Sequence, residues 1–376
     1  MKIIFICNEY PSLENHGGIG SFVKLTADFL ISNGHDVLIL GLSKKIHEKI
    51  KRDKINGVNV IRSKFLKFGN NTLNYIVNSI LFYFFVKKKI KEFNPDIIES
   101  HDWTAPLIKL PTSFKGKYYI RLHGSYSFFR NYSGMRFSKI IYLFEKFSIN
   151  KKAILIGVSR FILDETKNFF SKKNTGTVIY NSVNIKKFRV LNNTLKNQNK
   201  ILLIGKFHYY KGYDLLFKCL DDIFNEFDNF HIDVVGNFDS KTQKYLLNFI
   251  KQDYYNRVNF LGRIDNHLLP EVYNSSYCLI HPSRAEAHPI IPLESMACGT
   301  PVLISNRFSS NEFIINNNNG FLFSINSLEE MTADIIDSLH KLNERYSDIR
   351  NAAISTINKR FTIDKIIKEN LDEYLN

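Results

Sequence analysis

Short apolar segments alternate with helical segments along the 376 residues, and this alternation restricts the fold more than any other feature. Strands are expected at residues 3–7, 37–40, 58–62, 97–100, 118–122 and 154–158, and helices at about 21–33 and at 73–92. Strands separated by helices form parallel sheets, because each return crossing needs room for a helix. The first half of the chain is therefore predicted to be an α/β domain.

The same alternation begins again after a polar, asparagine-rich segment at residues 192–200. Strands are expected at 201–204, 230–235, 258–261, 278–280 and 302–305, and helices at 213–225, 241–251, 293–298 and 363–374. A single hydrophobic core stops growing at about 250–300 residues, so a chain of this length needs two cores. We expect a first domain at residues 1–190 and a second at 191–360.

The net charge is +15, and a charge of this sign and size favours anionic partners. Lys, Asn, Ile and Phe are abundant throughout, so a bias in genomic composition is an alternative cause of the charge. An apolar strand at residues 2–7 leaves no room for a signal peptide, and the four cysteines lie far apart in sequence, so we expect a cytoplasmic protein with reduced thiols. The cysteines are Cys7, Cys219, Cys278 and Cys298.

The longest apolar run, at residues 73–86, contains three polar residues and is shorter than the about 20 residues that span a bilayer. Four lysines follow it at residues 87–91. Two interpretations stay open. The helix lies on an anionic membrane surface, or it is buried in the first domain and its lysines suit the helix dipole.

Two glutamates, Glu286 and Glu294, lie on a predicted strand-to-helix turn with seven residues between them. The helix at 293–298 is predicted to end at Gly299 in a left-handed conformation. Ligands of open α/β sheets bind at the carboxyl ends of strands, and the free N–H groups of a helix start suit an anion. The pattern favours a phosphate-bearing ligand, although a glutamate in a first turn is also an ordinary partner for the helix dipole.

Lys206 and Lys211 follow another predicted strand, in a segment that opens a helix. Cations aimed at a leaving diphosphate stabilise the charge it gathers in the transition state, while solvated lysines at a turn are the alternative.

Gly17 and Gly18 belong to a glycine loop after the first strand, and His101 and His123 end two neighbouring strands. Glycines let backbone N–H groups approach a phosphate closely. The loop does not match G-x-G-x-x-G, which disfavours a Rossmann dehydrogenase.

Together these motifs resemble those of the family 4 retaining glycosyltransferases, over nearly the full length. Residues 282–302 resemble the family's E-x7-E block, 205–212 its G-R-x-x-x-x-K-G motif with Lys206 in place of Arg, and 180–184 its P-N-G-V-D motif. The resemblance implies the GT-B fold: two Rossmann-like, doubly wound parallel-sheet domains that face a cleft. It also implies that the last helix, within 361–376, packs back on the first domain.

The resemblance further implies transfer of a sugar, with retention, from a nucleotide-diphosphate sugar to a glycan or lipid-linked glycan. The expected setting is bacterial surface polysaccharide synthesis, of lipopolysaccharide or capsule, at the cytoplasmic face of the membrane. No cofactor besides the donor substrate and no nucleic-acid partner are expected, and an anionic membrane surface is an expected partner. A GT-B nucleotide-sugar epimerase and a non-catalytic sugar-nucleotide or glycan-binding protein stay open as alternatives.

The roles that the resemblance implies are specific to each residue. Glu286 orients the donor sugar, Glu294 holds the ribose, Lys206 and Lys211 stabilise the diphosphate, Gly17 and Gly18 contact phosphate, and His123 lies beside the anomeric centre. Where the family has two glycines this chain has Ala287 and Pro289. Proline has no N–H, so Ile290 and Ile291 are the expected backbone donors to the donor substrate. No D-x-D occurs, and we expect no catalytic metal.

Overall fold

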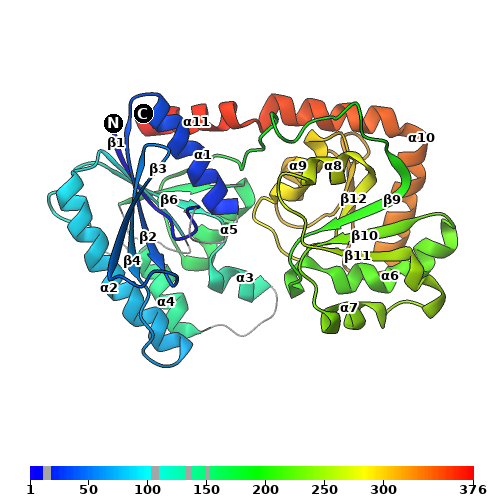
Figure 1. Ribbon diagram of the computed structural model, residues 1–376, viewed down its shortest axis with the longest axis horizontal. Helices are drawn as coiled ribbons and strands as arrows, with labels where there is room; N and C mark the ends of the chain where they lie inside the picture. Colours follow the sequence, from blue (N-terminus) through cyan, green and yellow to red (C-terminus); the bar gives the residue numbers. More distant parts are fainter. Residues whose placement is uncertain (12–17, 103–109, 133–137, 150–151) are drawn as a thin grey trace. The chain divides into compact units, whose positions relative to one another are not determined.

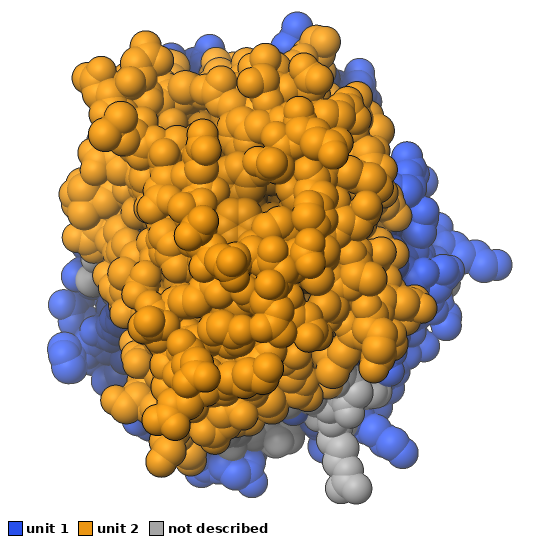
Figure 2. Space-filling model, turned by 90° about the vertical axis from the view of Figure 1, so that its right-hand side faces the viewer, with its two compact units in different colours: residues 1–180, 367–376 blue, residues 181–366 orange. Residues whose placement is uncertain are grey.

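The computed structural model describes residues 1–11, 18–102, 110–132, 138–149 and 152–376, shown as a ribbon in Figure 1. The chain divides into two compact units, coloured separately in Figure 2. Unit 1 comprises residues 1–180 and 367–376, and unit 2 comprises residues 181–366. The chain thus passes from one unit to the other within the 180–184 motif, and the expected boundary at residue 190 lies inside unit 2.

Unit 1 is built on an eight-stranded sheet with the strand order β3-β4-β2-β1-β5-β6-β7-β8. Its strands are β1 (Lys2–Ile6), β2 (Asp36–Ser43), β3 (Ile50–Ile55), β4 (Val58–Lys64), β5 (Ile97–His101), β6 (Lys117–Leu122), β7 (Ala153–Gly157) and β8 (Gly176–Val178). Neighbouring strands are parallel except for β3, which runs antiparallel to β4 at the edge. The central strand β5 is buried along its whole length, as expected where helices cover both faces of a parallel sheet.

The helices of unit 1 are α1 (Gly18–Ser32), α2 (Asn71–Phe93), α3 (Tyr126–Tyr132), α4 (Lys139–Ser148), α5 (Arg160–Phe170) and most of α11 (Ile363–Leu375). Helix α1 begins earlier than expected. Gly18 is therefore a helical residue and not part of a loop, which corrects the sequence-based interpretation. Gly17, the other glycine assigned to phosphate contact, lies outside the described residues.

The end of α11 is fixed to unit 1 by a buried charged cluster. Arg121 of β6 donates from Nε to Glu99 Oε1 of β5 over 2.7 Å, and both side chains are buried. The Tyr374 hydroxyl of α11 donates to Glu99 Oε2 over 2.5 Å, and Arg121 also contacts Asn370 of the same helix. Residues more than 240 positions apart are thereby joined in one hydrogen-bonded group.

Unit 2 contains a parallel sheet with the strand order β11-β10-β9-β12-β13-β14. Its strands are β9 (Asn197–Ile204), β10 (His231–Val235), β11 (Val258–Gly262), β12 (Ser276–His281), β13 (Val302–Ser305) and β14 (Phe321–Phe323). Helices α6 (Tyr213–Glu226) and α7 (Ser240–Leu247) pack together, and α8 (Leu269–Asn274) packs with α9 (Ile290–Ala297). The long helix α10 (Leu328–Arg360), which is kinked at Arg345, contacts both α6 and α9. The predicted pair of parallel-sheet α/β units is confirmed.

The order of the strands in unit 2 places the predicted motifs together. Strands β9 and β12 are hydrogen-bonded neighbours and run parallel, so their carboxyl ends lie at the same edge of the sheet. The segment with Lys206 and Lys211 follows β9, and the segment with Glu286 follows β12. Helix α9 ends before Gly299, whose φ of 69° confirms the predicted left-handed cap.

Candidate functional site

The segments that follow β9 and β12 touch at Gly212. This glycine follows the short 3-10 helix η1 (Tyr209–Lys211) and has a φ of 69°. A Cβ atom added there would lie 1.9 Å from the carbonyl oxygen of Pro282, closer than any non-bonded contact allows. Only glycine fits this position, and the close approach holds the Lys211 segment against the Glu286 segment.

We expect Gly212→Ala to lower the free energy of unfolding by about 3 kcal/mol or more, because backbone strain and the clash with Pro282 add. Gly262→Ala is a matched control: Gly262 has the same φ of 69°, but nothing lies within 4 Å of the added Cβ. Thermal unfolding of both variants measures the difference. Equal losses of melting temperature would show that the contact with Pro282 is not important.

Glu286 lies at the centre of a polar cluster beside this contact. Its Oε1 atom accepts from the Lys211 ammonium, from His281 Nε2 at 3.1 Å and from the Ser283 hydroxyl at 3.1 Å. Burial alone would raise the pKa of Glu286, but the charge of Lys211 and the hydrogen bond from His281 outweigh burial and hold the pKa at about 2. Glu286 is therefore ionised at neutral pH and can accept hydrogen bonds but cannot supply a proton.

A second ion pair fixes the same two segments. The Arg284 guanidinium makes two hydrogen bonds of 2.7 Å to the Asp214 carboxylate at the start of α6, and donates to the Tyr209 carbonyl over 2.8 Å. It also stacks over the Tyr209 ring, 4.1 Å from the ring centroid. Two parallel bonds and a stacked ring hold a guanidinium in one orientation, so this pair fixes the spacing between the segments.

Glu294 is the second predicted glutamate, and the side chain that hydrogen-bonds to it belongs to α8 and not to the Lys211 cluster. Its Oε2 atom accepts from the Tyr273 hydroxyl over 2.9 Å, and Tyr273 is fully buried. Burial raises the pKa of Glu294 to about 7, although the bond from Tyr273 and the charge of Lys187 act in the opposite direction. Near neutral pH the carboxyl is therefore poised between its two protonation states.

The first turn of α9 offers few backbone donors. The helix begins at Ile290, three residues earlier than expected, with Pro289 as its N-cap and Pro292 in its first turn. Neither proline has an N–H group, so the amides of Ile290 and Ile291 are the ones that the start of this helix leaves without an intrahelical partner. These are the two residues that the sequence singles out as backbone donors.

The remaining predicted residues lie elsewhere. Lys206 follows β9 but is exposed, and it is not part of the contacts that join Lys211 to Glu286.

In unit 1, His123 follows β6, and its Nε2 atom lies 3.1 Å from Nδ1 of His101. Its backbone N–H donates to Asp102 over 3.1 Å. Burial lowers the pKa of His101 to about 3 and that of His123 well below the usual 6.5, so both imidazoles are neutral at pH 7.

Three contributors to the site were missed from the sequence: His281, Tyr273 and the Arg284–Asp214 pair. His281 directly follows the strand predicted at 278–280 and precedes Glu286 by five positions, which is a usable signal. Tyr273 lies in a helix that the sequence did not predict. Asp214 and Arg284 are 70 positions apart, and nothing in the sequence pattern links them.

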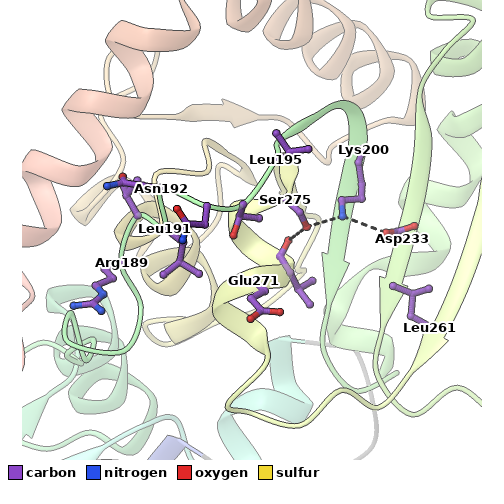
Figure 3. A pocket seen from close by; sticks show the side chains of 13 residues that line it. Arg189, Leu191, Asn192, Leu195, Lys200, Asp233, Leu261, Glu271 and Ser275 are labelled. Carbon is purple, nitrogen blue, oxygen red and sulfur yellow. Dashed lines mark hydrogen bonds and ion pairs between the residues drawn. The ribbon is translucent and has the colours of Figure 1, made fainter.

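A pocket of about 1210 Å³ lies on another part of unit 2, and Figure 3 shows the side chains that line it. They come from residues 189–195, from β9, β10, β11 and α8, and from Ser275 just after α8. Inside it, Lys200 is 3.8 Å from Asp233 and donates to the Ser275 hydroxyl over 2.7 Å. None of the predicted site residues lines this pocket, and its acidic and basic groups largely balance each other. It does not have the excess of positive charge that a diphosphate needs.

Within the described residues, no group of three or more His, Cys, Asp or Glu side chains is arranged to hold a metal ion. Over the same residues, no helix combines the length and the apolar character that crossing a bilayer requires.

Two family models match adjacent parts of the chain. The model described as Glycosyltransferase Family 4 matches residues 16–187, and the model described as Glycosyl transferases group 1 matches residues 184–356. An uncharacterised glycosyltransferase of Methanocaldococcus jannaschii is 25% identical over 401 residues, an alignment that covers 100% of this chain and 98% of that protein.

Solved structures share the fold. Sucrose-phosphate synthase from Thermosynechococcus elongatus has a TM-score of 0.81 at 16% identity, with 99% of this chain and 98% of that chain covered. Anabaena HepE in complex with UDP and glucose has a TM-score of 0.75 at 18% identity, with 99% of each chain covered. WaaG, a glycosyltransferase involved in lipopolysaccharide biosynthesis, has a TM-score of 0.75 at 15% identity, with 99% of each chain covered.

Proposed function

The chain belongs to the group 1 glycosyltransferases with the GT-B fold, and from this premise we propose that it transfers a sugar, with retention, from a nucleotide-diphosphate sugar to a glycan or lipid-linked glycan. The observation that carries the proposal is the contact of Lys211 with Glu286 at the carboxyl ends of β9 and β12. Ligands of parallel sheets bind at that edge. A cation and a carboxylate that is ionised at neutral pH suit a diphosphate and the hydroxyl groups of a sugar there.

Lys211 is the proposed cation for the diphosphate. Its side chain is 16% exposed, so its charge acts where water screens it poorly. The diphosphate gains negative charge as the bond to the sugar breaks, and a fixed cation stabilises that charge more in the transition state than in the ground state. We assign the N–H groups of Ile290 and Ile291 as hydrogen-bond donors to the same diphosphate. Lys206 is assigned to the solvent-facing side of the diphosphate.

Glu286 and Glu294 have separate proposed tasks. Glu286 accepts hydrogen bonds from the donor sugar, because its pKa of about 2 keeps it ionised. Glu294 accepts from the ribose hydroxyls, and those bonds favour its ionised form. Neither carboxylate is proposed as a nucleophile.

Retention then follows from attack on the face that the diphosphate leaves. The bond from the anomeric carbon to the diphosphate oxygen breaks, the acceptor oxygen bonds to the same carbon, and the acceptor's proton passes to the departing diphosphate. This step needs no protein base. His123, whose low pKa keeps it neutral, stays a predicted hydrogen-bonding group beside the sugar.

The proposed setting is surface polysaccharide synthesis, of lipopolysaccharide or capsule, on the inner side of the cell membrane. The fold similarity to WaaG supports this setting as an analogy. The reaction is proposed to need no metal, since Lys211 and the start of α9 offer positive charge for the diphosphate.

We expect one of UDP, GDP and ADP to raise the melting temperature, because a ligand at about 100 times its dissociation constant adds about 2.7 kcal/mol to the stability of the state that binds it. UDP is tested first, since HepE binds it. The shift is expected to persist in EDTA. No shift with any nucleotide would contradict the donor site, and a shift that EDTA abolishes would contradict metal independence.

Turnover separates this function from its alternatives. With donor and acceptor present, proton NMR is expected to show a product with the anomeric configuration of the donor. An inverted product would contradict retention. Conversion of the donor alone into an epimer would favour an epimerase, and nucleotide binding without turnover across a panel of acceptors would favour a binding protein.

A further inference from the structure

Helix α2 exposes large apolar side chains on the face that does not pack on the rest of unit 1. Leu73, Ile80, Leu81 and Phe84 are 43%, 45%, 46% and 60% exposed. Positions 73, 80 and 84 fall on one side of a helix, while Phe82 and Val86 are buried on the other. An ordinary surface helix is polar on its outer face, so α2 lacks the usual pattern. One side of this helix is buried in the domain, as one sequence-based interpretation expects, and the other side is open.

Helix α4 has the same feature and lies beside α2. Ile140, Leu143 and Phe147 follow the spacing of one helix face and are 47%, 46% and 57% exposed. The two helices meet where the rings of Tyr75 and Phe144 approach edge to face, with centroids 6.3 Å apart, and Figure 1 shows them adjacent. We call these seven exposed side chains the α2/α4 face.

The charges around the α2/α4 face are almost all positive. Near its end helix α2 carries Lys87, Lys88 and Lys91, and α4 contributes Lys139 and Lys146. Lys89 is buried and pairs with Glu92 over 2.5 Å, so it does not add to these lysines. The acidic residues of the two helices are Glu92 and Glu145. Glu145 is buried and accepts from the N–H groups of α3, so it does not offset the lysines at the surface.

We propose that the α2/α4 face docks on the surface of an anionic lipid bilayer. Its apolar side chains enter the boundary between headgroups and acyl chains, and its lysines lie on the headgroup phosphates. A second copy of this chain is disfavoured as the partner, because two identical faces of this kind would bring lysines against lysines. The proposal deepens the proposed function by locating where a lipid-linked acceptor is met, but docking itself is measured without catalysis.

Sedimentation of the full chain with vesicles tests this proposal. We expect binding to vesicles of phosphatidylglycerol and phosphatidylethanolamine, and little binding to phosphatidylcholine alone. Phe84→Ser/Phe147→Ser is expected to weaken binding at least about tenfold, because each lost side chain removes buried apolar area. Ile315→Ser is the matched control: Ile315 lies in unit 2 and is 60% exposed, the same fraction as Phe84, and its loss is expected to have no effect.

The lysines are tested separately. Lys88→Gln/Lys91→Gln is expected to weaken binding roughly fivefold or more at low salt, with a smaller difference at high salt. Unchanged binding in Phe84→Ser/Phe147→Ser, an equal loss in Ile315→Ser, or no binding to anionic vesicles would overturn the proposal. A dimer that Phe84→Ser disrupts, without vesicle binding, would assign the face to a second copy instead. The rise in melting temperature with nucleotide is measured on the same variants without vesicles. It shows whether each variant keeps an intact donor site, so a failure of docking can be told from a failure of the proposed function.

Discussion

Lys211→Met is expected to lower kcat by about 10²- to 10³-fold, the size of effect seen when one fixed charge-stabilising group is removed from an active site. The same change leaves the Glu286 carboxylate with His281 and Ser283 as partners but without its cation. Removing one partner of a poorly solvated ion pair costs about 3–5 kcal/mol of stability, so the melting temperature is also expected to fall. Steady-state kinetics and thermal unfolding measure the two effects.

A double variant separates catalysis from stability. Lys211→Met/Glu286→Gln removes both charges and is expected to recover much of the lost stability but none of the lost kcat. Lys341→Met is the control for loss of an ordinary lysine, since Lys341 pairs with Asp337 on the exposed surface of α10, and we expect it to change neither quantity by much. Wild-type kcat in Lys211→Met would remove this lysine from the mechanism.

Donor binding is expected to weaken about tenfold between pH 8 and pH 6, because the ribose hydroxyls need the ionised form of Glu294 and its pKa is about 7. Titration calorimetry with a nucleotide-sugar measures this. The Glu294→Gln variant is expected to bind the nucleotide-sugar weakly at both pH values. Any pH dependence of binding that remains in this variant would come from other titrating groups. An unchanged pH dependence in Glu294→Gln would separate this carboxyl from the ribose.

The same carboxyl affects stability in a defined direction. Its folded-state pKa lies above the usual 4.5, so between about pH 4.5 and pH 7 the folded protein binds more protons than the unfolded chain. The stability contributed by this group is present below pH 4.5 and is lost as the pH rises through 7, by roughly 3 kcal/mol. Glu294→Gln is expected to abolish that part of the pH dependence of the melting temperature.

Parts of the fold and the site follow from local rules that the sequence displays. Buried parallel strands are short apolar runs, so β1, β6 and β13 were predicted almost to the residue. Gly299 was predicted as a helix cap, because glycine adopts positive φ without strain. Lys211 and Glu286 were both placed at the ends of strands, and the adjacency of β9 and β12 brings them into contact.

Other parts depend on contacts between distant residues. Helix α10 is largely polar, and its buried apolar residues recur along a helix that packs on α6, α9 and β14; this periodicity was not recognised in the sequence. Strand β3 is a charged edge strand that forms only by pairing with β4. The raised pKa of Glu294 comes from burial against Tyr273 of α8, and the Arg284–Asp214 pair joins two segments 70 positions apart. No pattern within one segment carries such information.

A crystal structure with the nucleoside diphosphate that stabilises the protein most would test the central claim directly. We predict the diphosphate beside Lys211 and the N–H groups of Ile290 and Ile291, and the ribose hydroxyls on Glu294. A nucleotide bound instead in the pocket lined by Lys200, Asp233 and Glu271 would contradict the donor site proposed for this chain.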